Sequence, residues 1–234
     1  MRDFLNSTAI SASMTLSVAT WNVNSIRARM ELLLLWLQDN EPDIVCLQET
    51  KVQDDEFPVE TLDELGYTVV YKGQKTYNGV CILSTIEFDD VKKEFEDIEG
   101  DDKRLLQATI GDATVINGYF PQGRSPGTSS FYDKLDFIES LREYMSDGLT
   151  PDDAIVLVGD FNVAPRAIDV YDPELLEGSI GFHPKEREAL MLLAEWGLTD
   201  SFRELHPNER EFSWWDYRGG FRNNRGMRID HIWV

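Results

Sequence analysis

Short apolar runs alternate with amphipathic helical patterns along most of the chain. Mostly apolar runs that are bounded by polar or glycine-containing segments predict buried β-strands. Such runs occupy residues 16–23, 43–48, 67–71, 79–84, 113–120 and 154–161. Apolar residues that recur every three or four positions predict helices at residues 29–39, 131–145 and 185–196. This alternation of strands and helices indicates an α/β fold.

No segment divides the chain into separate units. The chain has 234 residues, of which 42% are hydrophobic and 11% aromatic, enough for a sizeable core. No linker rich in proline, glycine or serine interrupts it, so we expect one domain over residues 14–234 after a flexible extension at residues 1–13. Cys46 and Cys81 fall in apolar runs and are expected to be buried free thiols, as in a reducing compartment.

Neither a membrane span nor a secretory signal is predicted. No stretch approaches the roughly 18 consecutive apolar residues of a membrane helix. The segment "MRDFLNSTAISAS" at the N-terminus lacks the apolar centre of a secretory signal. We therefore expect a soluble, cytoplasmic protein with no membrane partner.

The charge of the chain is strongly negative but unevenly distributed. A formal net charge of −21 argues by itself against nucleic acid, because phosphate backbones bind basic surfaces. Residues 87–102 contain nine acidic residues and two lysines, which is typical of a solvated face. Residues 212–230, in contrast, contain four arginines and two aspartates. The total charge therefore does not exclude a local basic surface.

Polar side chains follow several of the predicted strands. A rigid sheet can hold such residues at one rim while the loops admit a substrate. They are Asn22, Asn24, Gln48, Glu49, Lys51, Asn117, Tyr119, Gln122, Asp160, Asn162 and Asp230. Most of these side chains offer oxygen, and no Cys/His cluster is present. This set suits a hard cation such as Mg²⁺ or Mn²⁺, bound by one or two carboxylates and water, better than zinc.

Each of these residues has a structural interpretation when it is taken singly. An isolated asparagine is commonly a turn or capping residue. Glu49 can simply pair with Lys51, and Asp160 follows a glycine at the end of a strand. In extended backbone, Asp160 and Asn162 are two residues apart and would point to one face. The recurrence of such polar residues at the ends of several predicted strands favours a functional site.

Eight segments together resemble a known family. They are "WNVNSIRAR", "PDIVCLQETKVQDDEFP", "GYTVVYKGQK", "VINGYFPQG", "VGDFNVAP", "WGLTDSFR", "FSWWDYR" and "NRGMRIDHI". In this order, from residue 16 to the last residue, they resemble the exonuclease III type of apurinic/apyrimidinic endonuclease, within the endonuclease/exonuclease/phosphatase superfamily. Phosphoinositide phosphatases and sphingomyelinases of that superfamily resemble the chain at the asparagine strand and at "GDFN", but not at "QETKVQDDEFP" or "FSWWDYR".

The resemblance implies a fold and an activity. The fold would be a four-layer α/β/β/α sandwich, with two mixed sheets face to face and helices outside. The activity would be metal-dependent phosphodiester hydrolysis of duplex DNA at abasic sites in base-excision repair, with 3′-end trimming as a further activity. Glu49 would be the principal ligand of Mg²⁺ or Mn²⁺, with Asn22 close by. A divalent cation facing the phosphate would offset the negative charge that builds up during hydrolysis.

The resemblance also implies roles for residues around the scissile phosphate. Asp160 and Asn162 would orient and activate the attacking water or assist the leaving oxygen, because such a water needs an acceptor within about 3 Å. Tyr119 and Gln122 would contact the phosphate. Asp230 would support a catalytic histidine.

A DNA-binding surface is expected after Ser213 and near the strand ends. The segment at residues 212–228 interleaves aromatic residues with arginines, and in the family it forms a pocket and wedge for a sugar that lacks its base. On this basis Trp214, Arg218 and Arg225 would contact DNA. Lys51 and Arg124 would bind phosphate groups of the DNA backbone. The alternative is a tryptophan-rich edge of the core with solvated arginines.

The histidine that Asp230 would support has no obvious counterpart. In the family it belongs to a later Ser-Asp-His segment, and this chain ends before one. His231 is expected to point to the opposite face from Asp230, His183 to start a helix, and His206 to lie in a surface turn. We expect a fragment that lacks its C-terminal strands rather than a naturally short member, because their loss would expose a sheet edge. The chain should then bind a divalent cation but cleave DNA far more slowly than a longer form, and equal turnover by both forms would contradict this.

Two other classes of function remain open at this point. One is a catalytically weakened or non-catalytic DNA-binding relative, suggested by the absent histidine and the acidic charge. The other is a superfamily phosphatase that acts on small phosphorylated molecules. The leading hypothesis is an enzyme that acts as a monomer on double-stranded DNA with abasic sites or 3′ ends.

Overall fold

The fold is described from a computed structural model. The structure describes residues 15–96, 98, 100–216 and 218–234. The predicted flexible extension at residues 1–13 lies outside these residues. Within them, no helix is both long and apolar enough to cross a bilayer.

The first sheet is mixed and has four strands. Across the sheet they are β1 (Val18–Asn22), β2 (Ile44–Gln48), β4 (Val80–Ser84) and β3 (Thr68–Lys72). β1 and β2 are parallel, and the other neighbours are antiparallel. Two helices cover its outer face, α1 (Ile26–Asn40) and α2 (Val59–Asp63). Leu33 and Leu37 of α1 pack there with Val45 and Leu47 of β2.

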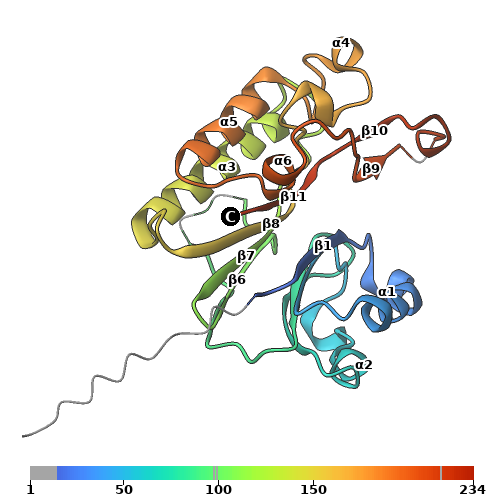
Figure 1. The fold of residues 1–234 in the computed structure, drawn as a ribbon, viewed down its shortest axis with the longest axis vertical. Coiled ribbons are helices and arrows are strands. Elements are labelled where there is room, and N and C mark those ends of the chain that lie inside the picture. Colours follow the sequence, from blue (N-terminus) through green and yellow to red (C-terminus); the bar gives the residue numbers. More distant parts are fainter. Residues whose placement is uncertain (1–14, 97, 99, 217) are drawn as a thin grey trace, which may run out of the picture.

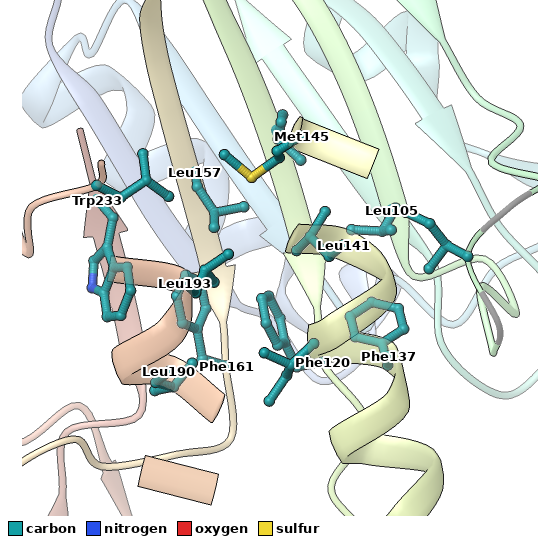
Figure 2. Close-up of a cluster of buried hydrophobic side chains, with 14 of the residues drawn as sticks. Leu105, Phe120, Phe137, Leu141, Met145, Leu157, Phe161, Leu190, Leu193 and Trp233 are labelled. Carbon is teal, nitrogen blue, oxygen red and sulfur yellow. The ribbon is translucent and has the colours of Figure 1, made fainter. Parts of the chain in front are cut away.

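The second sheet is also mixed and has five strands. Across the sheet they are β11 (Asp230–Trp233), β8 (Ala154–Asp160), β7 (Ala113–Tyr119), β6 (Leu105–Ile110) and β5 (Asp90–Lys92). Only β7 and β8 are parallel neighbours. Its outer face carries α3 (Ser129–Gly148) and α5 (Pro184–Glu195). Figure 2 shows their side chains packed with residues of this sheet: Leu105, Phe120, Phe137, Leu141, Met145, Leu157, Phe161, Leu190, Leu193 and Trp233.

The inner faces of the two sheets pack against each other. Ile44 and Cys46 of β2 point to this interface, whereas Val45 and Leu47 point to the helices. β2 is therefore buried on both faces, which explains why its sequence is a continuous apolar run and not an alternating one. The layers are helices, sheet, sheet and helices (Figure 1), so the predicted four-layer sandwich is confirmed. Cys46 and Cys81 are free and buried, as predicted.

Several short elements connect the layers at the rim. The helices are α4 (Pro173–Leu176) and α6 (Ser201–Leu205), with single 3₁₀ turns η1 (Asp54–Glu56), η2 (Ala167–Asp169) and η3 (Phe221–Asn223). β9 (Trp214–Trp215) and β10 (Gly226–Met227) form an antiparallel hairpin. The sequence prediction lacked β5, β6 and most of these short elements. It also started α1 three residues late, because the Ser25 hydroxyl accepts a hydrogen bond from the Ala28 N–H and caps the helix earlier.

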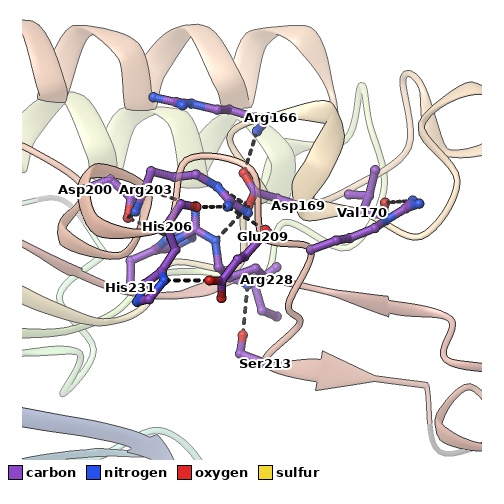
Figure 3. A network of polar contacts seen from close by, with 12 residues as sticks. Arg166, Asp169, Val170, Asp200, Arg203, His206, Glu209, Ser213, Arg228 and His231 are labelled. Carbon is purple, nitrogen blue, oxygen red and sulfur yellow. Dashed lines mark hydrogen bonds and ion pairs between the residues drawn. The ribbon is translucent and has the colours of Figure 1, made fainter.

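A buried ion-pair network holds β11 against the loops beside it (Figure 3). Asp169 is fully buried and accepts hydrogen bonds from Arg203 and from Arg228, whose Nε lies 2.7 Å from Oδ1. Arg228 also bonds Asp200, with Nη2 2.6 Å from Oδ2. Burial favours the neutral form of Asp169, but the two guanidinium groups overcome this and lower its pKa. The network joins η2, α6 and the segment that leads into β11.

We expect Asp169→Asn to lower the free energy of unfolding by about 3–5 kcal/mol, because it leaves two buried arginines without full compensation. Urea denaturation followed by circular dichroism measures this change. Glu139→Gln is the matched control, since Glu139 pairs with Arg142 at the surface and such pairs contribute at most about 1 kcal/mol. Equal loss in both variants would contradict the assigned importance of the network.

Candidate active site at the rim of the two sheets

Four strand ends meet at one rim of the sandwich. β1 and β2 end side by side, with Asn22 paired to Gln48, and Glu49 follows directly. In the second sheet Asp160 of β8 is paired with Asp230 of β11. β1 lies against both β8 and β11. Side chains from distant parts of the sequence therefore converge where the two sheets face each other.

Asn22 joins the carboxylates of the two sheets. Its Nδ2 donates to Glu49 Oε1 at 2.9 Å and to Asp160 Oδ2 at 2.8 Å. Its Oδ1 accepts from the Asn24 N–H at 3.0 Å. The amide nitrogen, and not the oxygen, thus faces the carboxylates. Asn22 therefore bridges Glu49 and Asp160, and its assignment to the metal site together with Glu49 stays a prediction.

Glu49 is held in its ionised form by its neighbours. Burial acts to raise its pKa, but hydrogen bonds from Asn22 and Lys51, and one from the Tyr119 hydroxyl, bring the pKa below its usual value. Lys51 Nζ lies 2.6 Å from Glu49 Oε2. Burial and the carboxylates of Glu49 and Asp160 raise the pKa of Tyr119, so this phenol stays protonated and acts as a donor.

Asp160 and Asn162 meet through a turn and not through extended backbone. β8 ends at Asp160, and Asn162 has a left-handed conformation with φ 54°. The expectation that both side chains share a strand face was therefore wrong. The Asn162 N–H donates to Asp160 Oδ1 at 2.9 Å, and Asn162 Nδ2 donates to the Phe120 carbonyl at 3.0 Å. Asparagine adopts this conformation more readily than most residues, which is why it suits the position.

Burial raises the pKa of Asp160 to about 6, and the charge of Glu49 adds to this, although hydrogen bonds from Asn22 and Asn162 oppose it. Asp160 is only 4% exposed. A carboxylate with a pKa near neutrality that lies in a cleft is a candidate for proton transfer.

Asp230 has a carboxylate as its charged neighbour and not the arginine that lies two residues earlier. Arg228 is engaged by Asp169 and Asp200, and no ion pair to Asp230 occurs among the residues that the structure describes. Its charged neighbour is Asp160, and burial together with that charge raises the pKa of Asp230 well above its usual value, partly offset by the Ser213 hydroxyl. Asp230 Oδ1 is buried without a hydrogen-bond partner.

None of the three histidines lies at Asp230 to receive its support. His231 is buried on the other face of β11, where its ring nitrogens lie 2.8 Å from Arg228 Nη1 and 2.9 Å from the Val163 carbonyl oxygen. Burial and Arg228 lower its pKa to about 4, so His231 is neutral at pH 7. His183 is the N-cap of α5, as the sequence predicted, and His206 caps the end of α6 directly before the turn at residues 207–208, where a surface turn was predicted.

The strand ends open into a cavity of about 840 Å³. Its floor contains Asn22, Glu49, Lys51, Asp160 and Asp230, and the hairpin of β9 and β10 forms a wall. From this hairpin and its connection the cavity is lined by Ser213, Trp214, Trp215, Asp216, Gly219, Phe221 and Arg222. Aromatic side chains thus stand directly beside the acidic floor.

A second hollow of about 480 Å³ is lined by Tyr119, whose hydroxyl bonds Glu49 of the first cavity. Gln122, Arg124 and Arg104 line it. The Arg104 guanidinium lies 4.8 Å from the centroid of the Tyr119 ring, and its Nη1 donates to the Tyr119 carbonyl at 3.3 Å. The charged side chains that line this hollow are two arginines, Arg104 and Arg124, and two aspartates, Asp102 and Asp133.

Some predicted residues lie away from these cavities, and other residues were missed. Arg218 and Arg225 are exposed on the hairpin connection and line neither hollow. Ser213, Phe221 and Arg104 were not predicted as site residues. One signal appears only in the backbone: left-handed residues other than glycine gather in the loops at this rim, and such conformations are typical of functional sites. They are Asn24, Ser25, Glu49, Lys51, Arg124 and Asn162.

The donor set fits one hard cation with a mostly hydrated shell. No group of three or more His, Cys, Asp and Glu side chains suited to a metal occurs in the part of the chain that the structure describes. The Glu49 carboxylate already attracts a cation, the Lys51 ammonium group. A single carboxylate supplemented by water and substrate phosphate is a usual arrangement for Mg²⁺.

Comparison with known proteins agrees with this geometry. Residues 19–234 match the family model described as Endonuclease/Exonuclease/phosphatase family. The chain belongs to this family. It is 39% identical to exodeoxyribonuclease III of Haemophilus influenzae over 229 residues, which cover 92% of this chain and 86% of that protein.

Solved structures of the endonuclease/exonuclease/phosphatase family superpose closely on this chain. An AP endonuclease from Archaeoglobus fulgidus is 40% identical, with a TM-score of 0.90 over 94% of this chain and 86% of that chain. The 3′ phosphatase NExo from Neisseria, bound to product DNA hairpin, is 38% identical, with a TM-score of 0.90 and the same coverage. The resemblance found in the sequence motifs is therefore confirmed.

Proposed function

We propose that this protein is a divalent-metal-dependent nuclease that cleaves duplex DNA at abasic sites. The observation that carries the proposal is the hydrogen-bonded series Glu49, Asn22 and Asp160 at the floor of a cavity whose wall is aromatic. The relatives named above act on DNA, as an exodeoxyribonuclease, an AP endonuclease and a DNA-bound 3′ phosphatase. Their similarity supports a DNA phosphodiester or phosphomonoester as the substrate of this chain.

The residues of the floor divide the chemistry between them. Glu49 is ionised and would hold Mg²⁺ or Mn²⁺, and this cation would supply charge stabilisation to the phosphate. Asp160 would accept the proton of the attacking water, because its pKa lies near neutrality. Asn162 would keep the Asp160 carboxylate oriented through its backbone N–H.

Donors around the floor would bind the phosphate oxygens. The protonated Tyr119 hydroxyl lies beside Glu49, and Lys51 pairs with the same carboxylate. If a cation bound at Glu49, the Lys51 ammonium group would leave this carboxylate and donate to a phosphate oxygen instead. Gln122 and Arg124 in the second hollow would bind the next phosphate of the strand.

The aromatic hairpin would accommodate a nucleotide without its base. Trp214 is 41% exposed and Phe221 is 75% exposed, although both are large and apolar. Exposed aromatic rings beside a phosphate site are suited to stack on bases or to occupy the gap that a missing base leaves. Arg218, Arg222 and Arg225 lie exposed on the same hairpin and would contact the backbone despite the net charge of the chain.

Removal of a 3′-terminal phosphate is a second candidate for the same centre. The exposed rims of both hollows leave room for a strand end, and the Neisseria relative is a 3′ phosphatase. Both reactions require the same attack of water on a phosphorus atom, so Glu49 and Asp160 would serve either.

The test is a cleavage assay with three substrates of 30 base pairs: a duplex with one abasic site, an intact duplex, and a nicked duplex with a 3′ phosphate. We expect Mg²⁺-dependent cleavage at the abasic site and no internal cleavage of intact duplex. Cleavage that persists in EDTA would refute the role of the cation. Absence of activity on all three duplexes would refute the DNA substrate.

Phe221→Ala should raise the KM for abasic duplex about 10-fold with little change in kcat, since aromatic contacts with nucleotides contribute about 1–3 kcal/mol each. Steady-state kinetics measures this split. Leu175→Ala is a matched control, because Leu175 is 64% exposed and lines neither hollow. A normal KM for Phe221→Ala would remove Phe221 from the binding surface.

A further inference from the structure

A fully buried ion pair lies beneath the loops of the candidate site. Lys134 of α3 and Glu186 of α5 both have 0% exposure, and Lys134 Nζ donates to Glu186 Oε1. Burial lowers the pKa of Lys134, while the carboxylates of Glu186 and Asp160 oppose this. A lysine is almost never completely buried unless it is paired. Its location therefore requires an explanation.

The other donors of Lys134 go to the backbone of two site loops. Nζ lies 2.9 Å from the carbonyl oxygen of Asn162 and 3.5 Å from that of Gln122. One ammonium group thus connects the loop that follows β8 with the loop that follows β7. An ammonium group has three N–H donors, and these three acceptors match them.

The packing around Lys134 leaves these loops little room to move. Gly123 has φ 84°, and a Cβ there would lie 3.1 Å from Lys134 Cδ and 2.9 Å from Ile180 Cδ1. The loop after β7 therefore lies directly on the Lys134 stem. Gly181 also packs closely against the loop after β8: a Cβ on Gly181 would lie 3.3 Å from the Asn162 carbonyl oxygen.

Glu186 anchors the pair to the helix layer. Its Oε2 accepts a hydrogen bond of 3.0 Å from the His183 N–H at the start of α5. The Lys134 side chain extends from α3 and is bound by Glu186 of α5. Its ammonium group is directed at the two loops. Stability alone does not require this arrangement, because well-packed neutral residues often replace a buried ion pair without loss.

We propose that Lys134 is a positioning residue that holds Asn162 and Gln122 at fixed positions relative to Asp160. The Asn162 N–H donates to Asp160 Oδ1, and the left-handed backbone of Asn162 then directs the carbonyl group of the same residue to Lys134. A cation bonded to the carbonyl of the same residue fixes that conformation. This inference rests on the proposed nuclease function for its kinetic test, but its structural part does not depend on that function.

The experiment compares Lys134→Met, Glu186→Gln and the double variant. Each single change leaves one unmatched buried group and should lower the melting temperature. The double variant removes both charges and should regain most of the lost stability. Its kcat on abasic duplex should nevertheless remain about 10-fold low with KM nearly unchanged, because small displacements of catalytic groups are costly. A purely structural ion pair would instead regain kcat together with stability.

A further measurement makes the inference falsifiable. Independently of activity, hydrogen–deuterium exchange should be faster at residues 121–124 and 160–163 in the double variant. Met145→Ala is the matched control: it removes a buried side chain of α3 outside these contacts, so it should lower the melting temperature without faster exchange in these loops.

The outcomes separate the two proposals. Unchanged exchange in both loops of the double variant, or recovery of wild-type kcat, would overturn the role of Lys134. An inactive wild-type protein with faster exchange in the double variant would refute the nuclease function and leave the positioning role supported.

Discussion

Glu49→Gln is expected to reduce cleavage of abasic duplex by roughly 1,000-fold, because a bound divalent cation contributes several kcal/mol to stabilisation of the transition state. Glutamine keeps the size of the side chain and can still accept from Asn22, but it loses the charge that attracts a cation. Single-turnover kinetics over a range of Mg²⁺ concentrations measures the loss. Calorimetric titration should show a matching loss of Mg²⁺ affinity.

Glu60→Gln is the control for this change, since Glu60 is exposed on α2 and lies away from both hollows. It should leave turnover and Mg²⁺ binding unchanged. If Glu49→Gln kept wild-type affinity for Mg²⁺, the assignment of Glu49 as the principal ligand would be wrong even if turnover fell.

Asp160→Asn is expected to reduce turnover by about 100- to 10,000-fold, the range for removal of a general base. The side chain remains nearly isosteric, so binding of abasic duplex in EDTA should persist. Rapid-quench kinetics and fluorescence anisotropy separate the two effects. Asp136→Asn, at an exposed position of α3, should behave as wild type.

The same substitution should increase stability at neutral pH. Asp160 has a pKa of about 6 in the folded protein, compared with 3.8 as its usual value, so the folded protein binds this proton more tightly. The stability contributed by the proton is complete below pH 3.8 and is lost as the pH rises through about 6. In EDTA, Asp160→Asn should therefore exceed wild type at pH 8 by on the order of 1 kcal/mol, and by less at pH 5. Equal melting temperatures at pH 8 would contradict the raised pKa.

Asp160→Asn is therefore expected to raise stability and lower activity, as is usual where catalytic groups are held in an arrangement that costs stability. Asp160 and Asp230 are paired across neighbouring strands in a buried environment, where the charge of Asp160 adds to burial in raising the pKa of Asp230. Their proximity has a cost in the absence of a cation. A divalent ion at the nearby Glu49 would reduce this repulsion.

Some of the site was visible in the sequence because short motifs carry their own local geometry. Glu49 follows a fully buried strand, and Asp160 and Asn162 follow another. Buried strands are recognisable as apolar runs, and a polar residue that directly follows such a strand lies at the rim of the sheet. The chemistry of the set, with oxygen donors and no cysteine or histidine cluster, also follows from the residue types alone.

Other parts of the site depended on contacts between distant segments. The contacts of Asn22 could not be predicted from its own segment, because its amide orientation is set by Asn24, Glu49 and Asp160 together. The charged environment of Asp230 could not be predicted locally, because Arg228, two residues earlier, pairs with partners that lie 59 and 28 positions away in the sequence. Lys134 lies within an amphipathic helix, where nothing in its immediate sequence distinguishes it from a surface lysine.

The sequence by itself determined most of the strands and helices and the α/β class of this protein, because apolar periodicity decides which side of each strand and helix is buried, whereas the four layers followed from the family resemblance. It also determined the family, since the motifs occur in order along the chain. Only the tertiary structure decided which charges neutralise each other, which carboxylates share the floor of the cavity, and which carbonyls a buried lysine holds. The physical reason is that electrostatic energies depend on distance and burial in three dimensions, and neither quantity is encoded in local sequence.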